Sequence, residues 1–137
     1  MKYTTVRVAV AALTALASLG VGSAAVASFA PPLRLNAVAF YAKVDLLGRQ
    51  ISGFKAKFTQ VNGRPAPGLP IRFVVSGEQY LLCEATTDTN GYAECRVGPL
   101  PSGISAIKLV LSGYDATFDG GRWYAPASAH NTVGLAY

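Results

Sequence analysis

Apolar and polar residues alternate along the middle of the chain, and this alternation predicts β-strands. The segment 54–59 reads FKAKFT, so an aromatic residue or alanine at every second position alternates with lysine or threonine. The segment 71–75 reads IRFVV and starts with the same alternation. A period of two is typical of a strand with one face on a core and the other in water. We therefore expect two strands whose apolar faces contribute to one core.

Further short runs rich in strand-forming residues predict more strands, at 35–44, 81–97, 104–111, 114–118 and 129–135. Segments dense in Gly, Pro, Asn and Ser separate these runs. No stretch of ten residues after position 27 has helical periodicity. Seven or eight short antiparallel strands at such intervals predict an all-β fold, with two sheets packed as a β-sandwich.

The segment 81–97 predicts a β-hairpin. Its centre, Asp88-Thr89-Asn90-Gly91, has the composition of a tight turn. The side chains of Asp88 and Asn90 can bond their own backbone, and Gly91 tolerates the positive φ that such turns require. We therefore expect these three residues to form the hairpin turn.

The chain has two cysteines, and the predicted hairpin places them opposite each other. Cys83 and Cys95 each lie six positions from Thr89. Directly opposed strand residues have Cβ atoms about 4.5–5.5 Å apart, and modest adjustment brings these to disulfide distance. We expect a Cys83–Cys95 disulfide, and hence an oxidising compartment, rather than a metal site needing about four ligands.

The N-terminus resembles an export signal. Lys2 and Arg7 precede an apolar segment, 8–27, that contains no charged residue and ends in Ala-Val-Ala. This order is typical of a cleavable signal peptide. We expect residues 1–27 to be removed before Ser28, so that the mature protein is secreted.

The competing interpretation keeps the apolar segment as a membrane anchor that displays the domain at the cell surface, because roughly 20 apolar residues can span a bilayer. With cleavage, residues 28–137 form one domain and no membrane association is expected. Loss of the two basic residues of the leader lowers the formal net charge from +5 to +3. The other basic residues are scattered rather than gathered in a stripe, which argues against a nucleic-acid partner.

Neither catalysis nor cofactor binding is expected. His130 is the only histidine and has no acid beside it in the sequence, and the serines lack a G-x-S-x-G nucleophile motif. The turn at 88–91 is not an EF-hand loop, since Thr86 stands where that pattern requires Asp. We expect no enzyme activity, no catalytic residues, no metal and no cofactor.

The segment Gly120-Gly121-Arg122-Trp123-Tyr124 is the best candidate for a contact surface. Trp, Tyr and Arg dominate binding hot spots, and glycines allow a loop to present them. The alternative is that Trp123 packs into the end of the sandwich, as aromatic residues of small β domains do. We favour packing, with Arg122, Trp123 and Tyr124 retained as the candidate binding surface.

Four segments together resemble the bacterial Ig-like domains of the invasin and intimin type. They are GRPAPGLPIRF at 63–73, TDTNGYA at 87–93, YDATFDG at 114–120 and YAPAS at 124–128. The resemblance implies an Ig-like β-sandwich of a secreted or surface protein. Such modules act as spacers, stalks or adhesive units and have no catalytic residues to transfer.

The sequence and the resemblance together predict a secreted, non-enzymatic module for extracellular structural or adhesive interaction. The expected partner is a protein or glycan at the cell surface, and we expect a monomer. The alternative is a soluble carrier of a small ligand or carbohydrate. A cleft lined by Phe118, Trp123 and Tyr124 would favour that alternative.

Overall fold

A computed structural model of the chain describes residues 31–136. The predicted leader, residues 1–27, and its cleavage site lie outside the described residues. From Pro32 onward the chain forms one compact unit.

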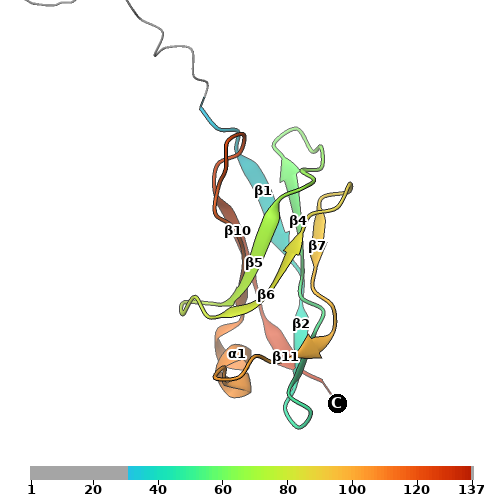
Figure 1. Cartoon of the computed structure of the whole chain (residues 1–137), viewed down its shortest axis with the longest axis vertical. Coiled ribbons are helices and arrows are strands. Elements are labelled where there is room, and N and C mark those ends of the chain that lie inside the picture. Colours follow the sequence, from blue (N-terminus) through green and yellow to red (C-terminus); the bar gives the residue numbers. More distant parts are fainter. Residues whose placement is uncertain (1–30, 137) are drawn as a thin grey trace, which may run out of the picture. The chain divides into compact units, whose positions relative to one another are not determined.

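The described part is an all-β fold with one short helix (Figure 1). Its elements are β1 (Leu35–Ala39), β2 (Ala42–Asp45), β3 (Gln50–Ser52), β4 (Lys55–Gln60), β5 (Pro70–Val75), β6 (Leu81–Thr86), β7 (Tyr92–Glu94), β8 (Gly98–Pro99), α1 (Ala106–Ser112), β9 (Tyr114–Phe118), β10 (Ala127–Asn131) and β11 (Val133–Leu135).

The strands form three small sheets, with the orders β1-β4-β7, β10-β9-β5-β6 and β11-β2-β3-β8. All described strand pairs are antiparallel except β2 with β11, which run parallel. The described residues form eleven strands rather than the seven or eight predicted. Two predicted strands are divided between sheets, the short strands β3 and β8 were not predicted, and one predicted strand is the helix α1.

The predicted strand 35–44 divides where its apolar period breaks. Ala39, Ala42 and Val44 are buried, so the inward positions shift by one residue between β1 and β2. A strict period of two would have placed Tyr41 inside, but it is exposed. The chain thus leaves the first sheet after Ala39 and continues in the third. The predicted strand 129–135 is also divided, between β10 and β11, although its more buried positions keep a period of two through Val133.

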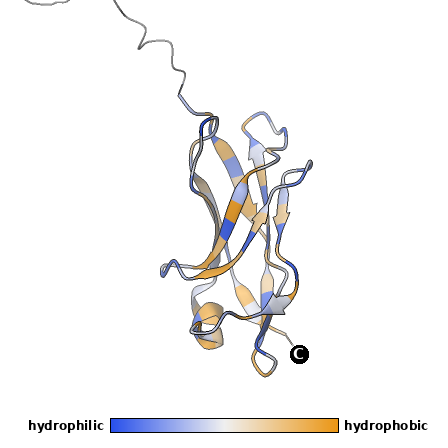
Figure 2. Cartoon of the chain, viewed as in Figure 1, coloured by the Kyte–Doolittle hydropathy of each residue, from blue (hydrophilic) through white to orange (hydrophobic). Residues whose placement is uncertain are grey.

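Apolar side chains from all three sheets and the helix form one core. Among the largest fully buried residues are Val44, Phe54, Phe58, Ile71, Phe73, Val75, Leu109 and Tyr114. The alternation that predicted inward-facing residues at 54–58 and 71–75 is confirmed. Figure 2 shows it as apolar and polar bands along β5.

The predicted hairpin ladder at 81–97 is wrong, although the turn at its centre is present. β6 pairs with β5, and β7 pairs with β4, so the two arms belong to different sheets. The Thr87 hydroxyl accepts a hydrogen bond from the Leu69 N–H at 2.8 Å and holds the first arm beside β5. The Phe58 N–H donates to the Gly91 carbonyl at 2.8 Å and holds the second arm beside β4.

The predicted strand at 104–111 is also wrong, because helix α1 occupies this segment. The Ser105 hydroxyl accepts a hydrogen bond from the Lys108 N–H at 3.2 Å and caps the helix. At the other end, the Gly113 N–H donates to the Leu109 carbonyl at 2.8 Å. Ala106 and Leu109, three positions apart, are buried on one face. The α1 helix is too short to cross a membrane, and no other helix occurs among residues 31–136.

Candidate binding surface

The Cys83–Cys95 disulfide is present, and both described cysteines belong to it. Cys83 lies on β6 and Cys95 directly follows β7, with the two Cα atoms 6.4 Å apart. Because β6 and β7 belong to different sheets, the bond ties two sheets together rather than two arms of one ladder. This is a structural link, and it removes both thiols from any chemistry.

The predicted turn residues form a tightly bonded turn. The Asp88 carboxylate accepts hydrogen bonds from the N–H groups of Asn90 at 2.9 Å and Tyr92 at 3.0 Å. Gly91 has φ +86°, and a Cβ there would lie 2.5 Å from the Phe58 carbonyl oxygen. The Asp88 side chain is thus engaged by its own backbone. In the described part of the chain, no group of three or more His, Cys, Asp or Glu side chains is placed to hold a metal ion.

Trp123 is exposed, so the favoured interpretation that it packs into the end of the sandwich is wrong. Its exposed fraction is 68%. The Arg122 guanidinium carbon lies 5.2 Å from the centre of the Trp123 ring, the distance of a cation–π contact. Tyr124 is half-buried and packs against the core. The three candidate residues thus divide into an exposed pair and an anchor.

Residues 119–125, which we call the contact loop, are held by backbone hydrogen bonds. The Gly121 N–H donates to the Tyr124 carbonyl at 2.9 Å and closes a turn around Arg122 and Trp123. The Leu33 N–H donates to the Trp123 carbonyl at 2.9 Å, and the Ala125 N–H donates to the Leu33 carbonyl at 2.8 Å. The exposed Trp123 side chain is therefore carried by a backbone that is held in place by hydrogen bonds on both sides.

Exposed apolar side chains continue from the contact loop onto the neighbouring segments. Leu33, which bonds the backbone of the loop, is 57% exposed, and Val61 is 69% exposed. Leu33 and Val61 also line one shallow hollow of about 370 Å³, together with Arg34. The part of the domain beside the contact loop thus combines apolar surface with basic side chains.

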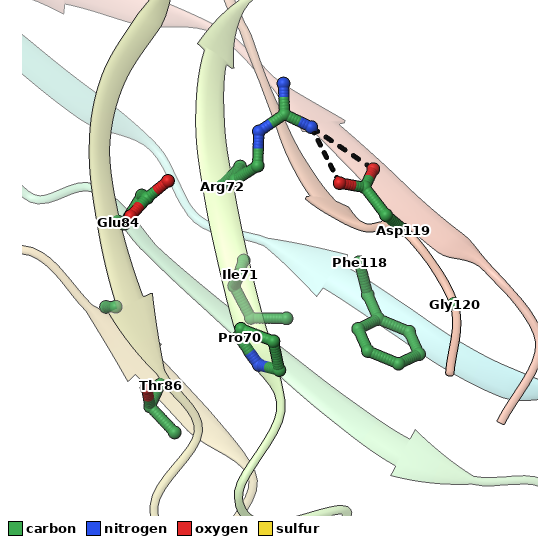
Figure 3. A pocket seen from close by; sticks show the side chains of 9 residues that line it. Pro70, Ile71, Arg72, Glu84, Thr86, Phe118, Asp119 and Gly120 are labelled. Carbon is green, nitrogen blue, oxygen red and sulfur yellow. Dashed lines mark hydrogen bonds and ion pairs between the residues drawn. The ribbon is translucent and has the colours of Figure 1, made fainter. Parts of the chain in front are cut away.

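A second hollow, which we call the outer groove, lies on the sheet that contains β5, β6 and β9 (Figure 3). Its volume is about 390 Å³. Arg72 of β5 donates two hydrogen bonds from one guanidinium nitrogen to the Asp119 carboxylate, at 2.9 and 3.2 Å. Glu84 of β6 lies on the other side of Arg72, opposite it in the strand register. The groove therefore carries an ordered row of acid, base and acid.

Sequence reasoning missed this row because its members are far apart in the chain. Arg72 and Asp119 are separated by 47 positions, and Glu84 belongs to a third strand. Only the pairing of β5 with both β6 and β9 brings them together. The same holds for His130, whose Nδ1 lies 2.9 Å from an Asp115 carboxylate oxygen across the β9–β10 pair. The contact with Asp115 orients the imidazole of His130, whose side chain is half-exposed.

Among residues 31–136, two side chains have shifted pKa values. The hydrogen bond with Glu78, and then the charge of that carboxylate, raises the pKa of the exposed Lys108 amine above its usual 10.5. Burial raises the pKa of the Tyr114 hydroxyl above its ordinary value of 10.0, against the opposing effect of its backbone partners Lys55 and Phe40. Neither residue lies in the contact loop or among the residues that line the outer groove.

No protein-family model matches the chain, and no curated protein matches it. Among solved structures, the chain is similar to a Ca²⁺-stabilised adhesin that helps an Antarctic bacterium reach out and bind ice. The two chains are 17% identical, with a TM-score of 0.36. The match covers 79% of this chain and 24% of the adhesin chain, so this chain spans about a quarter of that protein.

Proposed function

We propose that this chain is an exported Ig-like module that binds a cell-surface partner through its contact loop and has no enzymatic role. The observation that carries the proposal is the exposed Arg122–Trp123 pair. Trp and Arg are among the residues that most often dominate binding energy. A loop whose backbone is bonded on both sides loses little freedom when a partner docks.

The strand arrangement supports the Ig-like part of the proposal. In Ig domains, strands A, B and E lie in one sheet, and strands C, F and G lie in the other. Here β1, β4 and β7 take the first set of places, and β5, β9 and β10 take the second. Strand β6, beside β5, corresponds to the additional strand that variable-type domains place next to C. The disulfide differs from that of antibody domains, which links strands B and F.

The disulfide and the leader sequence support export. A disulfide between two partly or fully buried cysteines forms and persists in oxidising compartments. The basic and apolar pattern of residues 1–27 predicts the route to such a compartment. Secretion after cleavage remains the favoured form, and display on an uncleaved anchor is the alternative.

The test is binding of the purified mature protein to cell envelopes of the organism that encodes it. Trp123→Ala should reduce binding at least tenfold and change the free energy of unfolding by less than about 0.5 kcal/mol, because the side chain is exposed. Tyr80→Ala is the matched control, since Tyr80 is also an exposed aromatic residue but lies between β5 and β6. If Trp123→Ala binds as tightly as the wild type, the contact loop is not the binding surface.

A further inference from the structure

The outer groove begins where the contact loop begins. The groove is lined by Phe118, the last residue of β9, and by Asp119 and Gly120, which follow it. A Cβ at Gly121 would lie 3.5 Å from the Phe118 ring, so the loop crosses directly over that side chain. Trp123 follows two positions later. A partner that covers the contact loop can therefore extend into the groove.

The charges of the groove argue against several kinds of ligand. A free cation would meet the Arg72 guanidinium, which lies between the two carboxylates and already neutralises Asp119. An anion would face the carboxylates of Glu84 and Asp119 on both sides. A purely apolar ligand would strip water from all three charged groups, which costs several kcal/mol per ion. The groove is therefore best matched by a neutral ligand that is rich in hydrogen-bonding groups.

The unused hydrogen-bonding capacity of the groove alternates between acceptors and donors. Within residues 31–136, Glu84 makes no side-chain hydrogen bond or ion pair. Arg72 bonds Asp119 through one terminal nitrogen, so the N–H groups on its other two nitrogens remain available. Thr86 adds a hydroxyl at the same surface. Sugar hydroxyls both donate and accept, and neighbouring hydroxyls can bond a carboxylate and a guanidinium at once.

The contact loop supplies the other half of a sugar-binding surface. A pyranose ring has a weakly polar C–H face, which packs on the face of an exposed aromatic ring in the manner of other apolar groups. The groove has a volume of about 390 Å³ and is about half open to solvent, which suits a unit within a chain better than an enclosed end group.

We propose that the outer groove and the contact loop together bind a neutral glycan chain, with Glu84 and Arg72 bonding hydroxyl groups and Trp123 contacting a ring face. This rests on the proposed function, because it names the class of partner that the contact loop meets. Glu84 is the most informative residue, since it belongs to the groove alone and has no structural partner among the described residues.

The experiment measures binding of the mature protein to envelopes of the encoding organism, either untreated, oxidised with periodate or digested with protease. Periodate cleaves vicinal diols and so destroys most glycans, whereas protease removes protein partners. We expect periodate to lower binding at least tenfold and protease to leave it unchanged. Glu84→Gln should weaken binding about tenfold, the usual consequence of losing a charged hydrogen-bond partner.

Glu94→Gln is the matched control, because it makes the same change of charge at an exposed position of β7, in a different sheet. It should bind as the wild type does. Arg72→Lys keeps the charge but loses the planar fork, and should weaken binding in the same direction as Glu84→Gln. Circular dichroism of each variant separates lost binding from lost fold.

The outcomes distinguish this inference from the proposed function. Binding that is unchanged in Glu84→Gln overturns the role of the outer groove. Binding that survives periodate but not protease overturns the glycan as the partner. If Trp123→Ala alone abolishes such binding, the contact loop stands with a protein partner. If Glu84→Gln and periodate abolish binding but Trp123→Ala does not, the groove stands without the loop. Failure of the wild type to bind untreated envelopes overturns both.

Discussion

Tyr114 bonds the segment between β1 and β2, where the chain passes from one sheet to another. Its side chain is fully buried, and its hydroxyl lies within hydrogen-bond distance of the Phe40 and Lys55 carbonyl oxygens. The hydroxyl also accepts from the Phe40 N–H at 3.1 Å. One oxygen on β9 thus bonds the link between β1 and β2 and the start of β4. We predict that Tyr114→Phe destabilises the domain without changing its fold.

The expected cost is about 1–2 kcal/mol of unfolding free energy. A buried carbonyl that loses its partner costs about 1–3 kcal/mol. The lower part of this range applies because the Phe40 N–H keeps a second bond, to the Lys55 carbonyl at 2.9 Å. The aromatic ring remains, and with it the edge-on contact with Phe54 at 4.7 Å between ring centres. For a domain of this size the midpoint of thermal unfolding should fall by roughly 4–12 °C.

The same substitution should flatten the loss of stability at high pH. The pKa of Tyr114 is raised in the folded state, so its hydroxyl keeps its proton at pH values where the unfolded chain has lost it. This contribution is fully present below pH 10 and is lost as the pH rises through the folded pKa. Between pH 9 and 11.5, the urea midpoint of the wild type should therefore fall more steeply than that of Tyr114→Phe.

Urea unfolding followed by far-UV circular dichroism is the appropriate assay, since exposed Trp123 is a poor fluorescence reporter of the core. Tyr80→Phe is the control, because Tyr80 is exposed, and it should remain within about 0.5 kcal/mol of the wild type. If Tyr114→Phe is as stable as the wild type at neutral pH and has the same pH profile, the inter-sheet role assigned to the hydroxyl is wrong.

Two further predictions concern the links around the turn at 88–91. Thr87→Val should cost about 2–3 kcal/mol in urea unfolding, because the buried hydroxyl that donates to the Ala66 carbonyl at 2.7 Å is lost, and an unchanged midpoint would contradict this. The control is Thr86→Val, which makes the same change at the exposed neighbouring residue and should leave the urea midpoint nearly unchanged. Replacing Cys83 and Cys95 by Ser should cost about 3 kcal/mol, the entropy of a loop closed over 12 positions. Reduction of the wild type by dithiothreitol should lower the unfolding free energy by the same amount. No loss of stability would mean that the disulfide constrains neither the folded nor the unfolded chain.

The sequence predicted those features that depend on neighbours along the chain. The alternation at 54–58 predicted buried side chains because burial on one face of a strand repeats every second residue. The disulfide partners followed from there being two cysteines. The pairing of strands did not follow, since the 81–97 segment has hairpin chemistry only at its turn, and the bonds that separate its arms come from Leu69 and Phe58.

Helix α1 could have been found from its ends rather than from its interior. The β-branched residues at 107 and 110 favour a strand, but Ser105 and Gly113 stand at the positions of a helix cap and stop. Seven residues are too few for periodicity to outweigh composition. The outer groove had no such signal, because the ion pair between Arg72 and Asp119 exists only after β5 and β9 have paired.

The parallel pairing of β2 with β11 determines how the domain carries mechanical tension. The described chain enters beside β1 at one end of the domain and leaves after β11 at the opposite end (Figure 1). Tension between those ends pulls β2 and β11 past each other along their length. Their three register pairs, from Ala42 with Val133 to Val44 with Leu135, are then loaded together rather than one after another. Under such tension β11 can leave the domain only after this ladder has broken in shear.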